Sequence, residues 1–243
     1  EKKKQGIIHH IGMSTHNPKV AKLAALSGVV EIILFSINPA FDLLPASEDL
    51  NTYFADSYAE DLNGIDPERA ELYQVCEQRG IGITVMKGYA GGRLFSPQTS
   101  PFGVALTPVQ CIHYALTRPG VASILAGYDS TEHVTQAVAY ETATSKEKDY
   151  ASVLAHAPHH AYTGQCTYCG HCAPCPAGID VAMVNKLYDL ATMQEEVPST
   201  IKAHYESLSA GAKDCIACGG CEVRCPFDVP VVERMKRATV LFQ

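Results

Sequence analysis

The sequence lacks three features that would assign it to large classes of protein. No apolar stretch in its 243 residues approaches the roughly 20 residues that a membrane-spanning helix needs. Basic residues cluster only at positions 2–4, and the formal net charge of −7 argues against nucleic acid, whose phosphates require grouped lysine and arginine. Nothing at the N-terminus resembles a secretory signal. We therefore expect no membrane and no nucleic acid as partner, and a reducing, cytoplasmic location.

Cysteine, in contrast, is concentrated near the C-terminus. Eight of the ten cysteines form two runs of four. In each run two residues separate the first three cysteines from one another, and a proline follows the fourth. The runs are Cys166, Cys169, Cys172 and Cys175, and then Cys215, Cys218, Cys221 and Cys225. This spacing is typical of chains that hold two cubane [4Fe–4S] clusters.

The two runs differ in their last gap, which is three residues long in the second run and two in the first. In ferredoxins with two clusters, the last cysteine of each run binds the other cluster. We therefore expect the runs to exchange their last ligands. One cluster would bind Cys166, Cys169, Cys172 and Cys225, and the other would bind Cys215, Cys218, Cys221 and Cys175.

Zinc and disulfides are the alternative uses of these cysteines. Zinc also takes four thiolates, but from two C-x-x-C pairs rather than from three cysteines at strict two-residue gaps. Disulfides fit poorly with the missing secretory signal and with a chain that is otherwise poor in cysteine. The remaining two cysteines, Cys76 and Cys111, lie in apolar helical contexts and are predicted to be buried core thiols.

Upstream of the cysteine runs, strand-like and helix-like segments alternate. Apolar or β-branched runs indicate strands at 7–12, 29–34, 80–86 and 121–126. The run at 29–34 is continuous enough to predict a strand buried on both faces. Helical patterns follow at 19–26, at 67–78, from Thr107-Pro108 onward and at 130–143, several with proline in the first turn. This alternation predicts an α/β fold, a parallel sheet with helical crossovers.

Four such units are half of what an eight-stranded barrel requires. A half-barrel would leave two open sheet edges and an exposed apolar wall. Because the sequence begins at Glu1, only a few residues before the first strand, we expect the missing half in residues outside this chain or, failing that, in a second chain. We place a partial barrel at 1–147 and a helical ferredoxin-like domain at 148–243, with helices at 181–192 and 198–208 between the cysteine runs.

Several segments resemble the aldo/keto reductase family, and in particular its branch with a C-terminal ferredoxin-like module. In the barrel part the resemblance is carried by I-G-M-S-T-H at 11–16, Asn38, M-K-G-Y-A-G-G-R-L at 86–94 and I-L-A-G at 124–127. Both cysteine runs are also similar to that branch, including C-A-P-C-P at 172–176. The resemblance implies the C-terminal half of a TIM (β/α)8 barrel, followed by an α-helical dicluster domain.

The resemblance further implies a nicotinamide nucleotide, NAD(P), held at the C-terminal ends of the strands, where the sites of barrel enzymes lie. The candidate cofactor-binding residues are Ser14, Thr15, Asn38, Met86 and Lys87. The glycine-rich segment 88–92 either contacts the cofactor with its backbone or forms a tight turn after the third strand.

Two departures from the family limit what the resemblance implies. The family's phosphate-binding lysine and arginine fall on Gly127 and His133, so a tight NADP site is not expected. The catalytic tetrad comes from the first half of the barrel, and no part of it can be placed here. His9 and His10 lie one strand too late to supply its histidine. This chain alone is therefore not expected to be active.

Two functions fit these observations. In the first, the complete protein is an iron–sulfur oxidoreductase of aldo/keto reductase type, whose clusters relay electrons between a redox partner protein and a barrel-bound cofactor acting on a small-molecule carbonyl substrate. Because nicotinamide passes two electrons and a cluster passes one, a two-step carrier such as flavin is then required. In the second, the protein is a non-catalytic electron-transfer, redox-sensing or structural module on a degenerate barrel.

A histidine cluster precedes the first cysteine run. His156, His159 and His160 could bind a metal together, or they could belong to a polar linker. We expect the polar linker around Pro158.

Overall fold

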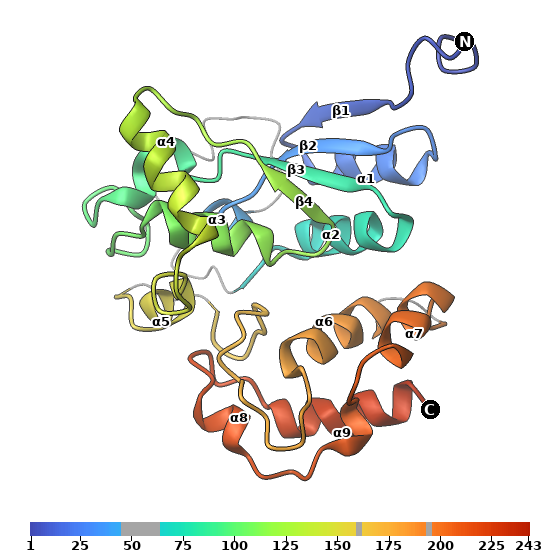
Figure 1. Ribbon diagram of the computed structural model, residues 1–243, viewed down its shortest axis with the longest axis vertical. Helices are drawn as coiled ribbons and strands as arrows, with labels where there is room; N and C mark the ends of the chain where they lie inside the picture. Colours follow the sequence, from blue (N-terminus) through green and yellow to red (C-terminus); the bar gives the residue numbers. More distant parts are fainter. Residues whose placement is uncertain (45–63, 159–161, 193–195) are drawn as a thin grey trace. The chain divides into compact units, whose positions relative to one another are not determined.

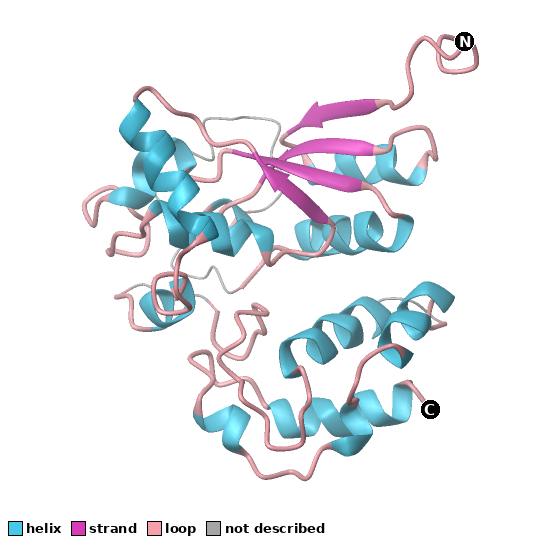
Figure 2. Ribbon diagram, viewed as in Figure 1, coloured by secondary structure: helices cyan, strands magenta, loops and turns pink. Residues whose placement is uncertain are grey.

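The computed structural model describes residues 1–44, 64–158, 162–192 and 196–243. Contacts between residues divide the chain into two units, Glu1–Ala161 and Tyr162–Gln243 (Figure 1). The first unit contains a sheet with its helices, and the second unit contains helices α6 to α9 (Figure 2). None of the described helices is long and apolar enough to cross a membrane.

The sheet of the first unit has four parallel strands in sequence order. Strands β1 (Gly12–Thr15), β2 (Ile32–Ser36), β3 (Gly82–Met86) and β4 (Val121–Ile124) pair in the order β1-β2-β3-β4. Each strand thus lies beside the next one along the chain, as in a (β/α) barrel, whereas a doubly wound sheet reverses its strand order. The predicted α/β fold, with parallel strands and helical crossovers, is confirmed.

Each crossover helix begins where the sequence supplies a cap followed by proline. Asn17, Asp66 and Thr107 each accept backbone hydrogen bonds at the start of a helix. Proline then takes the first turn, where its missing N–H is not needed. The helices of this unit are α1 (Pro18–Leu26), α2 (Pro67–Arg79), α3 (Pro108–Leu116) and α4 (Thr131–Val138), with 3₁₀ turns η1 (Phe41–Leu43), η3 (Ala90–Phe95) and η4 (Ala139–Glu141).

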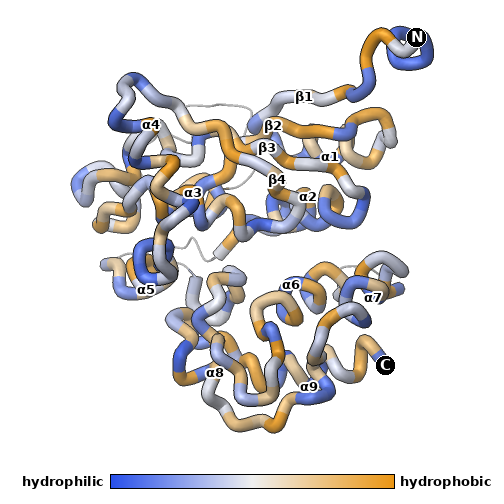
Figure 3. Tube along the Cα trace, viewed as in Figure 1, coloured by the Kyte–Doolittle hydropathy of each residue, from blue (hydrophilic) through white to orange (hydrophobic). Residues whose placement is uncertain are grey.

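The sheet is covered on one face. Ile33 and Phe35 of β2 are 0% exposed, while Ile32, on the other face, is 44% exposed. The prediction that residues 29–34 form a strand buried on both faces is therefore wrong. β2 is the most apolar part of the sheet and the edge strand β1 is much less so (Figure 3). We call the uncovered side, with Ser14, Ile32 and Ser123, the open face.

Two strand boundaries also differ from the prediction. The strand expected at 7–12 begins only at Gly12, which pairs with Ile32, and Ile7 and Ile8 are 63% and 42% exposed. The second strand ends at Ser36 rather than at Leu34. In both cases the apolar run marks the region, whereas pairing with the neighbouring strand decides which residues are extended.

A buried polar group holds the covered side of the sheet to its helices. Asp42 accepts hydrogen bonds from the hydroxyls of Tyr73, at 2.5 Å, and Tyr114, at 2.7 Å. Arg69 lies 3.6 Å from the same carboxylate and also donates to the carbonyl of Ser36 at 3.0 Å. Both Asp42 and Arg69 are 0% exposed, so the charges are paired inside the unit.

Helix α5 (Tyr150–Ala155) belongs to the first unit. The ring of Tyr150 packs edge-on against Tyr114 with centroids 5.2 Å apart. Gln110 Nε2 donates a hydrogen bond to the carbonyl of Asp149 at 2.8 Å. These contacts with α3 keep α5 with the sheet, beyond the position at 147 where the sequence suggested that the barrel part ends.

The second unit is built around two helices that pack against each other, α6 (Val181–Thr192) and α9 (Val231–Leu241). Arg234 of α9 forms a 2.6 Å ion pair with Asp189 of α6 and donates a hydrogen bond to the side chain of Asn185. Helix α7 (Ser199–Glu206) packs against α6, and an apolar cluster between them includes Leu187, Leu190 and Ile201. The unit is completed by η5 (Ala212–Asp214) and the short helix α8 (Gly220–Val223).

Candidate functional site

The eight cysteines of the two runs line two separate cavities of the second unit. Each cavity contains three cysteines of one run and the fourth cysteine of the other run. The first cavity is lined by Cys166, Cys169, Cys172 and Cys225, and the second by Cys215, Cys218, Cys221 and Cys175. The cysteines are therefore grouped as the spacing of the runs predicted, with the last members exchanged.

Positive φ angles occur at corresponding positions of the two runs, a likeness that was not expected from the sequence. In or just after each run, three positions have a positive φ, and they correspond in order. They are Tyr168 (56°), Gly170 (84°) and Gly178 (72°) for the first run, and Ala217 (53°), Gly219 (73°) and Asp228 (52°) for the second. Left-handed residues among right-handed ones turn successive N–H groups toward one concave side, a geometry found at many iron–sulfur sites. In the second run Ala217 N donates to Cys215 Sγ at 3.4 Å.

The thiols are free, and some have strongly raised pKa values. None of the ten cysteines, all of which lie in the described ranges, forms a disulfide. Burial raises the pKa of Cys166 and of Cys172 to about 12. The thiolate, not the neutral thiol, binds metals. A positively charged metal group would displace the proton and stabilise the thiolate in this buried position.

Four thiols line each of the two cavities of the second unit. Among the described residues, no three His, Cys, Asp or Glu side chains are arranged to hold a single metal ion. A zinc ion requires its sulfurs about 2.3 Å away on all sides. A cubane is bound at its corners, and its four thiolates consequently surround several metal and sulfide atoms. Four cysteines around each cavity are the donor set that such a group needs.

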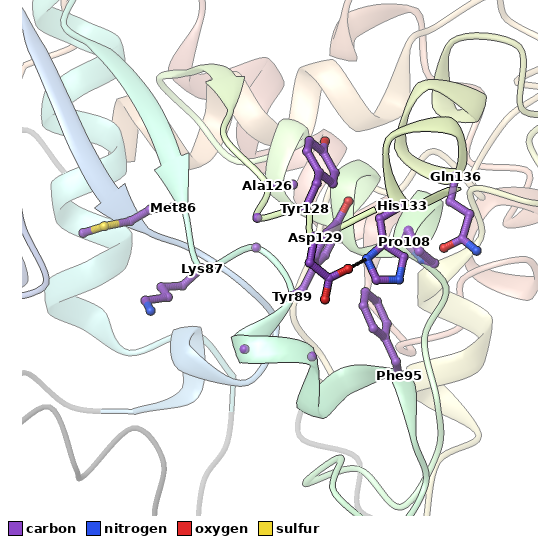
Figure 4. Close-up of a pocket in the computed structure, with 14 residues that line it drawn as sticks. Met86, Lys87, Tyr89, Phe95, Pro108, Ala126, Tyr128, Asp129, His133 and Gln136 are labelled. Carbon is purple, nitrogen blue, oxygen red and sulfur yellow. Dashed lines mark ion pairs between the residues drawn. The ribbon is translucent and has the colours of Figure 1, made fainter. Parts of the chain in front are cut away.

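A third cavity, of about 650 Å³, lies in the first unit where β3 and β4 end (Figure 4). Aromatic rings form much of its wall, and Tyr89 and Phe95 lie with centroids 4.9 Å apart. Asp129 and His133 face each other with 2.7 Å between Oδ1 and Nδ1 (Figure 4). Tyr128 also lines the cavity. The cavity can thus receive a flat ring and offer a carboxylate to hydroxyl groups.

The cofactor-binding residues expected from sequence fall into two groups. Met86 and Lys87 line the third cavity, and Lys87 has a positive φ of 59°. Figure 4 shows the Lys87 side chain directed away from Asp129 and His133. Ser14 and Thr15 lie on β1, two strands from β3, with Ser14 exposed on the open face. The structure thus places Met86 and Lys87 at the cavity and leaves Ser14 and Thr15 outside its lining.

Asn38 has a structural use in the first unit. It is 0% exposed, and its Oδ1 accepts hydrogen bonds from the backbone N–H groups of Ala40 and Phe41. Its Nδ2 donates to the carbonyl of Lys87 at 2.9 Å. The side chain therefore ties the end of β2 to the end of β3 and supports the backbone beside the third cavity.

Sequence reasoning missed the aromatic wall and the Asp129–His133 pair. Tyr89, Phe95 and Tyr128 are separated along the chain, and only the meeting of the β3 and β4 ends brings them together. The glycine-rich segment after β3 does form a tight turn, with positive φ at Gly91 and Gly92. His156 is exposed, with its Nδ1 2.7 Å from the carbonyl of Ser152, and His159 and His160 lie outside the described residues.

Comparison with known proteins identifies the cysteine region. Residues 165–230 match the family of 4Fe-4S dicluster domains. These residues include all eight cysteines of the two runs and most of the lining of both cysteine-lined cavities. The match supports iron–sulfur clusters in the second unit.

The remaining comparisons add less. A search of curated proteins gave no match. Among solved structures, the chain is similar to aldo-keto reductase AKR11C1 from Bacillus halodurans (holo form), with 18% identity and a TM-score of 0.43. That likeness covers 60% of this chain and 50% of the reductase chain, so this chain spans about half the length of the protein that it matches. The fold assigned above rests on the strand order of the sheet.

Proposed function

We propose that this chain is part of an iron–sulfur oxidoreductase of aldo/keto reductase type, in which two [4Fe–4S] clusters relay electrons. The observation that carries the proposal is the exchange of cysteines between the two cavities. Three thiols of one run and one of the other line each cavity. This arrangement supports two clusters bound at the predicted positions, since dicluster ferredoxins exchange ligands in the same way.

The residues of the chain have distinct tasks in this proposal. The eight thiolates hold the clusters, which when bound pass one electron at a time. The backbone N–H groups at the left-handed positions stabilise the sulfur charge. The packing of α6 on α9 keeps the two runs together, because each of these helices follows a cysteine run closely in sequence.

The third cavity is the proposed site of a nicotinamide nucleotide. It lies at the C-terminal ends of β3 and β4, where barrel sites form, and its aromatic rings suit a flat heterocycle. The catalytic tetrad of the family has no counterpart in this chain, so we propose that hydride transfer to a small carbonyl compound requires further barrel strands. The exposed side chains of the open face favour a covering layer there, from the same polypeptide or a second chain.

A pair of double variants tests the clusters and their crossed ligation together. Anaerobically prepared wild-type protein is expected to contain about eight iron atoms and to give an EPR signal on reduction. If the ligands are exchanged, Cys166→Ala with Cys225→Ala removes one cluster, because both residues bind the same one. Cys166→Ala with Cys175→Ala then removes both clusters. Uncrossed ligation predicts the opposite pattern, and iron-free wild-type protein would sink the proposal.

A second candidate function is favoured by one observation. The side chain of Asn38 makes hydrogen bonds within the first unit instead of facing a cofactor. This suits a barrel that has lost its nucleotide site. The protein would then transfer electrons or sense redox state without hydride chemistry. Anaerobic NADH or NADPH separates the two functions, because it reduces the clusters of the complete protein only if the nucleotide site is active.

A further inference from the structure

One arginine links the two cysteine runs at the point where they cross. Arg224 immediately precedes Cys225, and its Nη2 donates hydrogen bonds to the carbonyls of Cys172, at 2.5 Å, and Pro174, at 2.8 Å. Those two carbonyls flank the short segment that leaves the first cavity at Cys172 and enters the second at Cys175. Because Nη2 donates to both carbonyls, the guanidinium fixes this segment against the second run.

The same guanidinium lies in the wall of the second cavity. Arg224 lines that cavity together with Cys218. A β-carbon placed on Gly220 would lie 3.3 Å from Arg224 Nη1 and 3.8 Å from Cys218 Sγ. The positive charge and the sulfur therefore approach the same point, and the missing side chain of Gly220 leaves that point open.

The arginine beside the first cavity is paired with a carboxylate, and His171 in the wall of this cavity interacts with Cys169. Arg234, the basic residue on the neighbouring α9, forms a 2.6 Å ion pair with Asp189. The hydroxyl of Tyr168, in the wall of the first cavity, also donates to Asp189, at 3.0 Å. The charge of Arg224, in contrast, is bound to neutral carbonyls, so it is not cancelled by the groups it contacts.

The second cavity also has the more solvent-exposed cysteine. Cys218 of the second cavity is exposed, while the other seven cysteines of the runs are partly buried. Reduction adds negative charge to a cluster, and both a nearby positive charge and contact with water stabilise that charge. The charge of Arg224 and the exposure of Cys218 thus both favour the second site as the first to accept an electron.

We propose that Arg224 is a positioning residue with two effects: it holds the 172–175 crossover against the second run, and it makes the cluster of the second cavity the easier one to reduce. This inference rests on the proposed pair of clusters. The electron comes from an external one-electron reductant, and each cluster takes up one electron without gain or loss of ligands.

The test is a reductive titration of the full chain with dithionite, followed by EPR. Two separate one-electron steps are expected in the wild type. Arg224→Met should lower the potential of the first step toward that of the second and leave the second step nearly unchanged. Arg224→Lys should recover most of the potential, because it keeps the charge. Arg237→Met is the matched control, since Arg237 is an exposed arginine of α9 paired with Glu233.

The second readout follows the crossover itself. Hydrogen exchange at residues 170–178 should accelerate in Arg224→Met, because its side chain cannot donate to either carbonyl. Unchanged potentials in Arg224→Met, equal shifts of both steps, or the same shift in Arg237→Met would overturn the assignment. A single unresolved step in the wild type would do so as well. Wild-type protein without iron would instead refute the proposed function.

Discussion

The hydroxyl of Tyr114 donates a 2.7 Å hydrogen bond to Asp42 Oδ2, and so joins α3 to η1 across 72 residues of sequence. Tyr73 and Arg69 approach the same buried carboxylate from α2. Four polar side chains from three elements thus meet at one point of the core. Removing any one of them leaves its hydrogen-bonding partners unsatisfied, because buried groups have no water to take its place.

Substitution of the buried carboxylate should strongly destabilise the first unit. Asp42→Ala leaves the charge of Arg69 uncompensated at a site that is 0% exposed. The expected loss is about 3–5 kcal/mol in the free energy of unfolding, measured by urea denaturation. Tyr114→Phe removes one donor to a charged group and should cost about 1.5–3 kcal/mol. Equal, small losses for both variants would show that the carboxylate is not the centre of this network.

Two glycines with similar φ angles should respond differently to alanine. Gly120 has a φ of +74°, and a β-carbon there would lie 3.0 Å from Cys76 Cβ and 3.1 Å from Glu77 N. Gly80 has a φ of +65° with nothing within 4 Å of its β-carbon position. Gly80→Ala should therefore cost only the left-handed strain, about 1–2 kcal/mol, and Gly120→Ala distinctly more. The midpoints of thermal unfolding of the two variants decide the comparison, and a smaller effect at Gly120 would contradict it.

Cys76 and Cys111 should resist alkylation in the folded protein. Both are 0% exposed, and burial raises the pKa of each thiol to about 12. At pH 8 about one thiol in ten thousand is then ionised, and the reactive thiolate fraction increases tenfold with each pH unit up to that pKa. Mass spectrometry after treatment with iodoacetamide should find both residues unmodified in native protein and modified in urea. Rapid labelling of native protein at pH 8 would show that these residues are not core thiols.

The third cavity should prefer NADH over NADPH if it binds a nucleotide. Asp129 can accept hydrogen bonds from ribose hydroxyls, whereas its charge repels a 2′-phosphate. We expect roughly tenfold or greater preference for NADH in titration calorimetry of the complete protein. Asp129→Asn should reduce the difference between the affinities for NADH and NADPH. Glu141→Gln, a substitution at an exposed residue outside the cavity, should leave that difference unchanged. Equal affinities in the wild type would remove this role from Asp129.

Local signals determined how much of the fold could be predicted. The helices that begin after Asn17, Asp66 and Thr107 start within one residue of the expected position, because the cap and the proline lie in the sequence itself. The strand at 7–12 was placed too early, since the β-branched residues at its start have no neighbouring strand to pair with. Pairing is a property of the sheet, and an apolar run alone does not reveal it.

The candidate sites divide in the same way. The grouping of the cysteines was expected, because the spacing of the runs is that of two-cluster ferredoxins, which exchange their last ligands. The proposed role of Arg224 depends on carbonyls 50 and 52 residues away, and the sequence around position 224 does not indicate it. Tyr89 and Tyr128 face one cavity only because β3 and β4 are adjacent. Tertiary proximity of this kind has no counterpart in a local pattern.

The exchanged fourth cysteines make the two halves of the second unit mutually dependent. A fragment that ended before residue 215 would retain three of the four thiols around the first cavity and one of the four around the second. Neither half of the unit thus supplies a complete set of four thiols by itself. Loss of either run therefore removes thiols from both cavities at once.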